Sequence, residues 1–243
     1  MTHQLSCGIV PSLWVLGMVL TLSSPAQGQA PGSSAGATIY VSADAGSGGN
    51  GSQGRPFASL SQAESASAAG DTIYLLASDS GMVLDGGIAL KPRQKLLGIG
   101  ADGALLEDAA DRVGLTNTAA LPGGVMVELS DHNEVAGIHF MNMGNAAISG
   151  ASTDYSGTFI HHSTFSGNAA EHIEDERGLV YAISFDAASG SVDDIRVEDS
   201  SFYDGEDLGA IRVFQSGDSR GNYRFQRNDF SDLGGRAYFV RTR

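Results

Sequence analysis

One phrase recurs four times in the second half of this chain, as NEVAGIHFMNMG (133–144), SGTFIHHSTFSGN (156–168), VDDIRVEDSSFYDG (192–205) and NYRFQRNDFSDLGG (222–235). Each copy places a large apolar residue five positions before a reference phenylalanine: Phe140, Phe165, Phe202 or Phe230. These phenylalanines lie 25, 37 and 28 residues apart. Two positions after each stands a residue that tolerates a left-handed turn: Asn142, Gly167, Asp204 or Asp232. Self-similarity at a period of roughly 20–50 residues predicts a solenoid.

The composition places the chain in the all-β class and narrows its partners. The 243 residues include 33 glycines, and Val, Ile and Phe come in short bursts with no long helical period. The formal net charge is −14 and no basic stripe is present, which excludes nucleic acid as a partner. The same charge repels an acidic polysaccharide unless a divalent cation bridges the two.

Residues 1–28 are predicted to be a secretory signal peptide. Residues 1–30 contain no Lys, Arg, Asp or Glu, and residues 9–22 form an apolar run that is too short for a comfortable membrane span. Small residues up to Gly28 suit cleavage. Because no basic residue precedes the apolar run, a mis-assigned start or an uncleaved anchor remains an alternative.

The rest of the chain is predicted to be one exported domain. Residues 29–37 read as a short flexible linker, and 38–243 as the folded domain. The single cysteine, Cys7, lies in the leader, so the mature domain has no disulfide. We therefore expect a secreted protein, extracellular or periplasmic, with no membrane span after signal removal.

The first part of the domain carries a family resemblance. YVSADAGSGGNGSQGRPFASL (40–60) contains a strand, a glycine-rich loop and a Ser59–Gln62 capping box, and AAGDTIYLL (68–76) leads into a second strand. This order resembles the N-terminal segment of secreted pectate-lyase-like proteins, including the calcium-dependent pectate lyases. With the phenylalanine repeat, the resemblance covers most of 38–243. It implies a single-stranded right-handed parallel β-helix with a short N-terminal capping α-helix.

The middle of the chain gives a weaker signal. Two short strands at 88–91 and 95–100 flank a proline turn, and 125–130 resumes the strand pattern. Residues 101–124 have mixed features, compatible with one helical turn or a loop.

Alternation along each repeat assigns side chains to the two faces of a strand. Counted from the reference phenylalanine, positions −7, −5 and 0 are predicted to face inward, and −6 and −4 outward. In this register His161 neighbours Glu198 on the next turn, and Arg196 neighbours Arg224. A His–carboxylate pair suits proton transfer, which makes His161 and Glu198 candidate catalytic residues. The alternative is an exposed ion pair contributing about 1 kcal/mol or less.

An acidic cluster is the second candidate site. Its five carboxylates are predicted ligands for Ca²⁺, which takes oxygen ligands: Asp193, Asp194, Asp204, Glu206 and Asp207. The lyase resemblance implies that such a calcium ion holds the substrate carboxylate while a Lys or Arg acts as base. Arg212 takes that place, five residues after Asp207, although Leu208 replaces the family's glycine and Arg its lysine. The alternative is a set of turn acids at a solvated corner.

The end of the chain is predicted to be an exposed strand. The strand AYFVRTR (237–243) has no cap after it, so this exposed last turn is expected to pair with further chain or with another subunit.

The first hypothesis for function is binding or cleavage of acidic polysaccharide, lyase-like and calcium-assisted. The second is a non-catalytic surface or adhesin-type solenoid.

Overall fold

The computed structural model describes residues 36–118, 124–143, 146–150, 155–168, 180–187, 192–203, 205, 208–215 and 221–242. All of them belong to one unit, Ala35–Arg243. The predicted signal peptide, 1–28, lies outside the described residues, as does most of the predicted linker. Among the described residues no helix is long and apolar enough to cross a bilayer.

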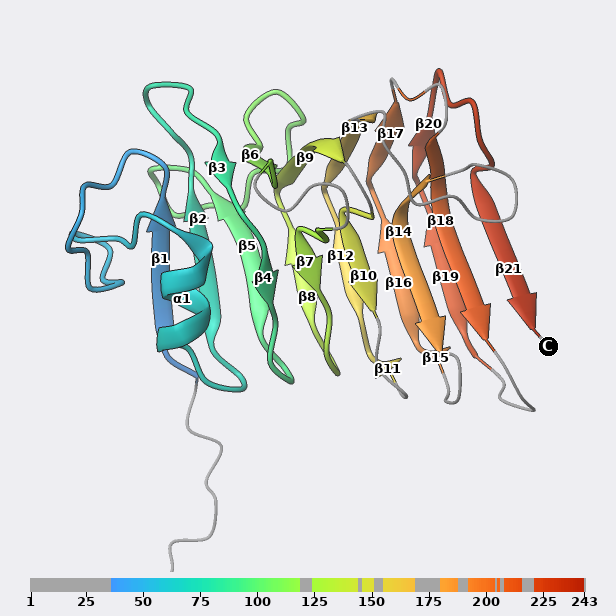
Figure 1. Cartoon of the computed structure of the whole chain (residues 1–243), viewed down its shortest axis with the longest axis horizontal. Coiled ribbons are helices and arrows are strands. Elements are labelled where there is room, and N and C mark those ends of the chain that lie inside the picture. The colour runs from blue at the N-terminus through green and yellow to red at the C-terminus, as the bar shows by residue number, and fades with distance from the viewer. Residues whose placement is uncertain are drawn as a thin grey trace, which may run out of the picture. The chain divides into compact units, whose positions relative to one another are not determined.

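Three main sheets, all of parallel strands, contain most of the regular structure (Figure 1). In spatial order, sheet 1 consists of β1 (Thr38–Ser42), β2 (Thr72–Leu76), β5 (Lys95–Ile99), β8 (Glu134–Ala136), β12 (Phe159–His161), β16 (Ile195–Glu198) and β19 (Tyr223–Gln226). Sheet 2 consists of β3 (Leu84–Asp85), β6 (Val113–Thr116), β9 (Ile138–Met143), β13 (Thr164–Asn168), β17 (Ser201–Tyr203) and β20 (Asp229–Phe230). Sheet 3 consists of β4 (Ile88–Ala89), β7 (Val127–Glu128), β10 (Ile148–Gly150), β14 (Val180–Ala187), β18 (Leu208–Gln215) and β21 (Tyr238–Thr242). A small parallel pair joins β11 (Tyr155–Ser156) to β15 (Val192–Asp193).

The chain visits the three sheets in a fixed cyclic order. After β1 it passes from sheet 1 to sheet 2 to sheet 3 and returns to sheet 1, with β11 and β15 on the return paths. We call one such pass a circuit. Each strand pairs in register with the strand of the same sheet one circuit earlier or later, as Ile160 does with Val135 and Val197. The predicted all-β, parallel architecture is confirmed, and the arrangement is compatible with a parallel β-helix-like solenoid.

The predicted N-terminal helix is present as α1 (Leu60–Ala66). The Ser59 hydroxyl accepts from the Gln62 backbone N–H at 3.4 Å, as expected for the N-cap of a capping box. The Gln62 side chain accepts at 3.1 Å from the N–H of Ala58, one residue before the N-cap, in place of the N–H of Ser59 itself. The Glu64 carboxylate accepts from the backbone N–H of Ala89 in β4, the first strand of sheet 3, at 3.0 Å. The helix therefore satisfies part of an otherwise unpaired sheet edge at this end of the stack (Figure 1).

The repeat's phenylalanines form a continuous stack inside the unit. The rings of Phe140, Phe165 and Phe202 are fully buried, with centroids 4.9 and 4.7 Å apart and nearly parallel planes. Phe230 continues the stack at 5.1 Å but is only partly buried. The inward columns at −5 and 0 are confirmed, because the parallel register places equivalent residues directly above one another.

Left-handed residues mark two corners of each circuit. The predicted corner, two residues after the phenylalanine, is confirmed at Asn142, Gly167 and Asp232, with φ of 52°, 70° and 51°. A second corner lies three residues before the phenylalanine and was not predicted. Its members are Gly137, His162, Asp199 and Arg227, with φ between 45° and 72°. Histidine and arginine do not signal this conformation in a sequence, since mainly Gly, Asn and Asp adopt it readily.

A ladder of buried polar side chains follows a third corner, at the start of each sheet 1 strand. Asp71, Gln94 and Asn133 each accept a backbone N–H of their own turn at 2.6–2.8 Å. The amides of Gln94 and Asn133 also donate to backbone carbonyls of the preceding circuit. These side chains satisfy backbone groups that the turns leave unpaired, so Asp71 has a structural role.

The structure decides the ambiguous segment and shows the exposed last circuit that the sequence predicts. The ambiguous segment 101–124 contains a strand of sheet 2, β6, and its described residues, 101–118 and 124, contain no helix. In the last circuit Tyr238 and Val240 are 42% and 50% exposed. The interior of that circuit is thus less covered than the interior of the circuits before it.

Candidate functional site

The outer face of sheet 1 carries the predicted catalytic residues. Five neighbouring strands give two outward columns, Lys95, Glu134, Phe159, Arg196 and Arg224 at position −6, and Leu97, Ala136, His161, Glu198 and Gln226 at position −4. The predicted adjacencies are confirmed, because His161 is in register with Glu198 and Arg196 with Arg224.

The expectation that the whole −4 column faces solvent is wrong. Ala136 is fully buried, and His161 is 7% exposed. The Phe159 ring stacks on the His161 ring, with centroids 4.1 Å apart. A large aromatic ring on the adjacent column therefore covers the imidazole and removes it from water, which strict alternation does not anticipate.

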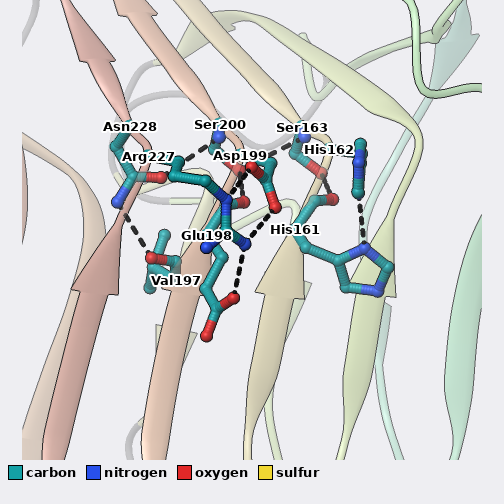
Figure 2. A network of polar contacts seen from close by, with 9 residues as sticks. All are labelled: His161, His162, Ser163, Val197, Glu198, Asp199, Ser200, Arg227 and Asn228. Carbon is teal, nitrogen blue, oxygen red and sulfur yellow. Dashed lines mark hydrogen bonds and ion pairs between the residues drawn. The ribbon is translucent and has the colours of Figure 1, made fainter.

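Both nitrogens of His161 are engaged by protein groups. Its Nδ1 lies 2.8 Å from Nδ1 of His162 (Figure 2), and its Nε2 lies 3.3 Å from a carboxylate oxygen of Glu134. Glu198 instead accepts from Arg227 at 2.8 Å. The predicted His–carboxylate pair thus exists with a different partner. Glu134 lies on the other column and one strand back, a diagonal contact that directly opposed positions do not reveal.

The charge on Glu134 is strongly stabilised. The hydrogen bond with His161 is the largest cause, and Lys95, whose ammonium lies 2.6 Å away, adds to it. Together they lower the pKa of Glu134 from 4.5 to about 2, against the opposing effect of burial. A carboxylate held in this way stays ionised and does not donate a proton near neutral pH.

Burial lowers the pKa of His162, and the neighbouring His161 lowers it further. A hydrogen bond between two Nδ1 atoms needs one donor and one acceptor, so His162 in its neutral form fits the acceptor role. Both nitrogens of His161 thus contact protein groups, Nδ1 the His162 ring and Nε2 the Glu134 carboxylate. These contacts hold the ring of His161 in place.

Glu198 and Asp199 are clamped by one arginine. Arg227 donates from Nε and Nη2 to Asp199 at 2.6 and 2.7 Å, and from Nη2 to Glu198 at 2.8 Å (Figure 2). This fork lowers the pKa of Asp199 and raises that of Arg227. The predicted catalytic carboxylate of Glu198 is therefore paired with an arginine that it shares with Asp199.

A buried ladder beneath this clamp fixes its backbone. The Ser163 N–H donates to the Ser200 hydroxyl at 3.3 Å, and the Ser200 N–H donates to the side-chain oxygen of Asn228, Oδ1, at 3.1 Å. The Asn228 amide donates in turn to the carbonyl of Val197 at 2.9 Å (Figure 2). Small hydroxyls and one amide thus tie three circuits together at this corner.

Arg196 and Arg224 form a cationic pair next to this network. The Arg196 guanidinium lies 4.5 Å from the centroid of Phe159, and its closest carboxylate, Asp194, is 3.9 Å away. Arg224 is exposed and forms no ion pair with the described residues. Both line a surface hollow of about 540 Å³ that also includes Tyr223 and Asn222. Two guanidinium groups with little internal compensation thus face solvent on adjacent strands.

The predicted base Arg212 lies elsewhere. It belongs to β18 in sheet 3, where its Nη2 is 3.7 Å from Asp186 and its guanidinium lies 5.6 Å from the centroid of Phe214. The structure does not join it to His161 or Glu198, which belong to sheet 1. The three predicted catalytic residues therefore do not form one constellation.

The calcium prediction falls largely outside the described residues. Asp204, Glu206 and Asp207 lie outside the described residues. The carboxylate of Asp193 accepts three hydrogen bonds, two from Asn222 and one from the Asp194 N–H, each at 2.9 Å. These hydrogen bonds lower the pKa of Asp193. Among the described residues, no group of three or more His, Cys, Asp or Glu is arranged to hold a metal ion. Because three of the five predicted ligands lie outside the described residues, the calcium site stays a prediction.

Comparison with known proteins finds no relative of this chain. No protein-family model, no curated protein and no solved structure matches the chain.

Proposed function

We propose that the chain binds acidic polysaccharide, without cleaving it, on the outer face of sheet 1. The observation that supports this most is the pair Arg196 and Arg224, in register on adjacent strands with little compensation. A guanidinium matches a carboxylate in a forked geometry, and a guanidinium stacked on an aromatic ring keeps its N–H edge available. Phe159 holds Arg196 in such a stack. Successive uronate carboxylates are ligands of matching charge.

The finer architecture belongs to the same proposal. We infer that 38–243 form a single-stranded right-handed parallel β-helix of the pectate-lyase-like kind. The cyclic order of the three parallel sheets supports a single winding direction. Crossovers between parallel strands of one sheet are right-handed in nearly all proteins, which favours that hand. An exported protein with the predicted signal at 1–28 would meet such polysaccharides outside the cytoplasm.

Binding is favoured over cleavage by the state of the candidate acid and base. A general base needs a free nitrogen or oxygen within reach of the substrate proton. Both nitrogens of His161 are engaged and its side chain is buried, while Glu198 is paired with Arg227. The same observation favours a second candidate function, a non-catalytic surface solenoid that does not recognise carboxylates.

Calorimetry on the full chain tests the proposal. The titrants are an oligogalacturonate and a neutral oligosaccharide of equal length, each with and without calcium. We expect only the uronate to bind, and more weakly at high salt. Binding should not need calcium, because the arginine pair offers a local positive charge against the repulsion by the net charge of −14. Arg196→Gln and Arg224→Gln should each weaken binding about 5–30-fold, the loss expected when one charged hydrogen-bonding group is removed. Arg93→Gln, an exposed arginine outside this face, is the matched control.

The outcomes separate the candidates. Equal binding of the neutral oligosaccharide, or unchanged affinity in the Arg196→Gln/Arg224→Gln double variant, would reject recognition by the arginine pair. The appearance of an unsaturated, ultraviolet-absorbing product would replace a binder with a lyase. No binding of any uronate would leave the surface solenoid.

A further inference from the structure

A second recess lies on the outer face of sheet 2, away from the residues discussed so far. It has a volume of about 540 Å³ and is bordered by β6, β9 and the segments 77–83 and 106–112. That size is within the range of about 300–1,000 Å³ that is typical of small-molecule pockets. Its lining combines an apolar wall with one arginine and one histidine.

The apolar wall is formed by Met82, Val83, Leu106 and Met141. Met82 and Val83 are 54% and 38% exposed, which is unusual for large apolar side chains next to a buried core. The side chains of Met141 and Val83 pack directly over Gly114. A Cβ added there would lie 2.9 Å from Cε of Met141 and 3.2 Å from both methyl groups of Val83. Any other residue at 114 would therefore displace these two side chains of the apolar wall.

Arg112 brings to this wall a positive charge that forms no ion pair with the described residues, although Asp108 acts on it at longer range. Its Nη1 donates to the Thr164 hydroxyl and its Nη2 to the Glu107 backbone carbonyl at 2.8 Å. Both acceptors are neutral, and no carboxylate among the described residues lies within ion-pair distance of Arg112. Each Nη atom retains one further N–H, while the buried Nε makes no hydrogen bond. Burial is the main cause that lowers the pKa of Arg112.

His139 adds a neutral polar group beside the arginine. Its Nε2 is hydrogen-bonded to the Ser166 hydroxyl at 2.7 Å, whereas its Nδ1 has no hydrogen-bond partner among the described residues. Burial lowers the pKa of His139, and the charge on Arg112 lowers it further, so the ring is neutral near pH 7. The one acidic side chain in the lining, Asp111, is exposed to solvent.

We propose that this recess binds a small carboxylate that carries an apolar tail. The carboxylate pairs with the Arg112 guanidinium, and the tail packs on Met82, Val83 and Met141. A carboxylate is favoured over phosphate because one guanidinium offers a planar fork that matches two oxygens, and because the chain's charge of −14 penalises higher anionic charge. This site is independent of the arginine pair on sheet 1.

Titration of the full chain with octanoate, followed by calorimetry and NMR, tests this inference. Octanoate should bind, and octanol, which has the same tail without the charge, should bind at least about 10-fold more weakly. Arg112→Gln should reduce octanoate affinity about 10–100-fold, the range for a lost charged hydrogen bond, with Arg93→Gln as the control. Bound octanoate should also raise the pKa of His139, because it neutralises the adjacent charge.

A second variant guards against an effect of Arg112 on folding. Gly114→Val displaces Met141 and Val83 from the apolar wall, leaves Arg112 intact, and should abolish octanoate binding while the far-ultraviolet spectrum is unchanged. Equal affinity for octanol and octanoate, or full binding by Arg112→Gln or Gly114→Val, would overturn the proposal. Failure of octanoate to bind the unaltered chain would overturn it as well. None of these results depends on whether uronates bind sheet 1.

Discussion

The outer faces of sheets 1 and 2 differ in the charges they carry and in how those charges are compensated. On sheet 1 Glu134 contacts both Lys95 and His161, and Arg227 holds two carboxylates. On sheet 2 Arg112 contacts a hydroxyl and a carbonyl. Opposite charges on sheet 1 stand one strand apart. The corresponding row on sheet 2 is nearly uncharged: Gly114, His139, Thr164, Ser201 and Asp229. The register of the strands therefore decides which charged side chains pair with one another and which remain available to a ligand.

The largest predicted effect tests whether the buried phenylalanine stack stabilises the sheets that carry both faces. Phe165 is fully buried between two stacked rings, so Phe165→Ala should lower the free energy of unfolding by about 3–5 kcal/mol. Phe230→Ala, at the partly buried end of the stack, should cost less. Urea unfolding monitored by circular dichroism measures both. If Phe230→Ala lowered the free energy of unfolding as much as Phe165→Ala does, burial within the stack would not determine how much each ring stabilises the two sheets.

A smaller effect tests the compensated charge on sheet 1. Glu134 is 25% exposed, and its pKa is about 2 against an ordinary 4.5. A carboxyl with a depressed folded-state pKa contributes stability above its unfolded pKa, and that contribution is lost as pH falls from 4.5 towards 2. Glu134→Gln should therefore cost about 1–3 kcal/mol at neutral pH, after allowance for solvent screening.

The pH dependence provides the control for this variant. The stability difference between the unaltered chain and Glu134→Gln should shrink as pH falls through that window. The difference for Phe165→Ala should stay constant there, since neither side chain titrates. A difference for Glu134→Gln that is independent of pH would show that the contact with His161 and Lys95 does not stabilise the carboxylate.

The smallest effect concerns the histidine of the uncompensated face. His139 has a pKa lowered below 6.5 by burial and by Arg112. Because the unfolded state binds the proton more tightly, stability should begin to fall as pH drops below 6.5, before the window of Glu134 is reached. NMR titration of the imidazole gives its pKa, and Arg112→Gln should move that pKa upward. An unchanged pKa in Arg112→Gln would place the cause in burial alone.

Much of the fold could be predicted because the spacing of the repeat gives the pairing of its strands and the position of one corner. The spacing of Phe140, Phe165 and Phe202 gives the register of sheet 2, and Asn142 and Gly167 mark a corner by residue type. Strand β6 escaped notice because Val113–Thr116 is short and contains a glycine. The corner that holds His162 and Arg227 escaped notice because those side chains do not favour a left-handed backbone. There the surrounding hydrogen bonds impose the conformation.

The candidate sites were predicted less well, for a different reason. Sequence spacing gives directly opposed neighbours, so the adjacency of His161 to Glu198 could be foreseen. The contacts that form depend on side-chain reach, and His161 turns to Glu134 while Phe159 covers it. The sheet 2 recess depends on Arg112, Val83 and Met141, which come from separate circuits and share no motif. Gly114 was the available signal, a glycine inside a strand.

The cyclic order of the sheets has a consequence for how such a chain can change over evolutionary time. Each strand pairs only with the circuit before and the circuit after it, so a circuit is held by local neighbours and not by the chain as a whole. Duplication or deletion of one complete repeat would insert or remove one phenylalanine ring and leave the other pairings unchanged. A ligand that spans several circuits would thereby gain or lose one binding step at a time.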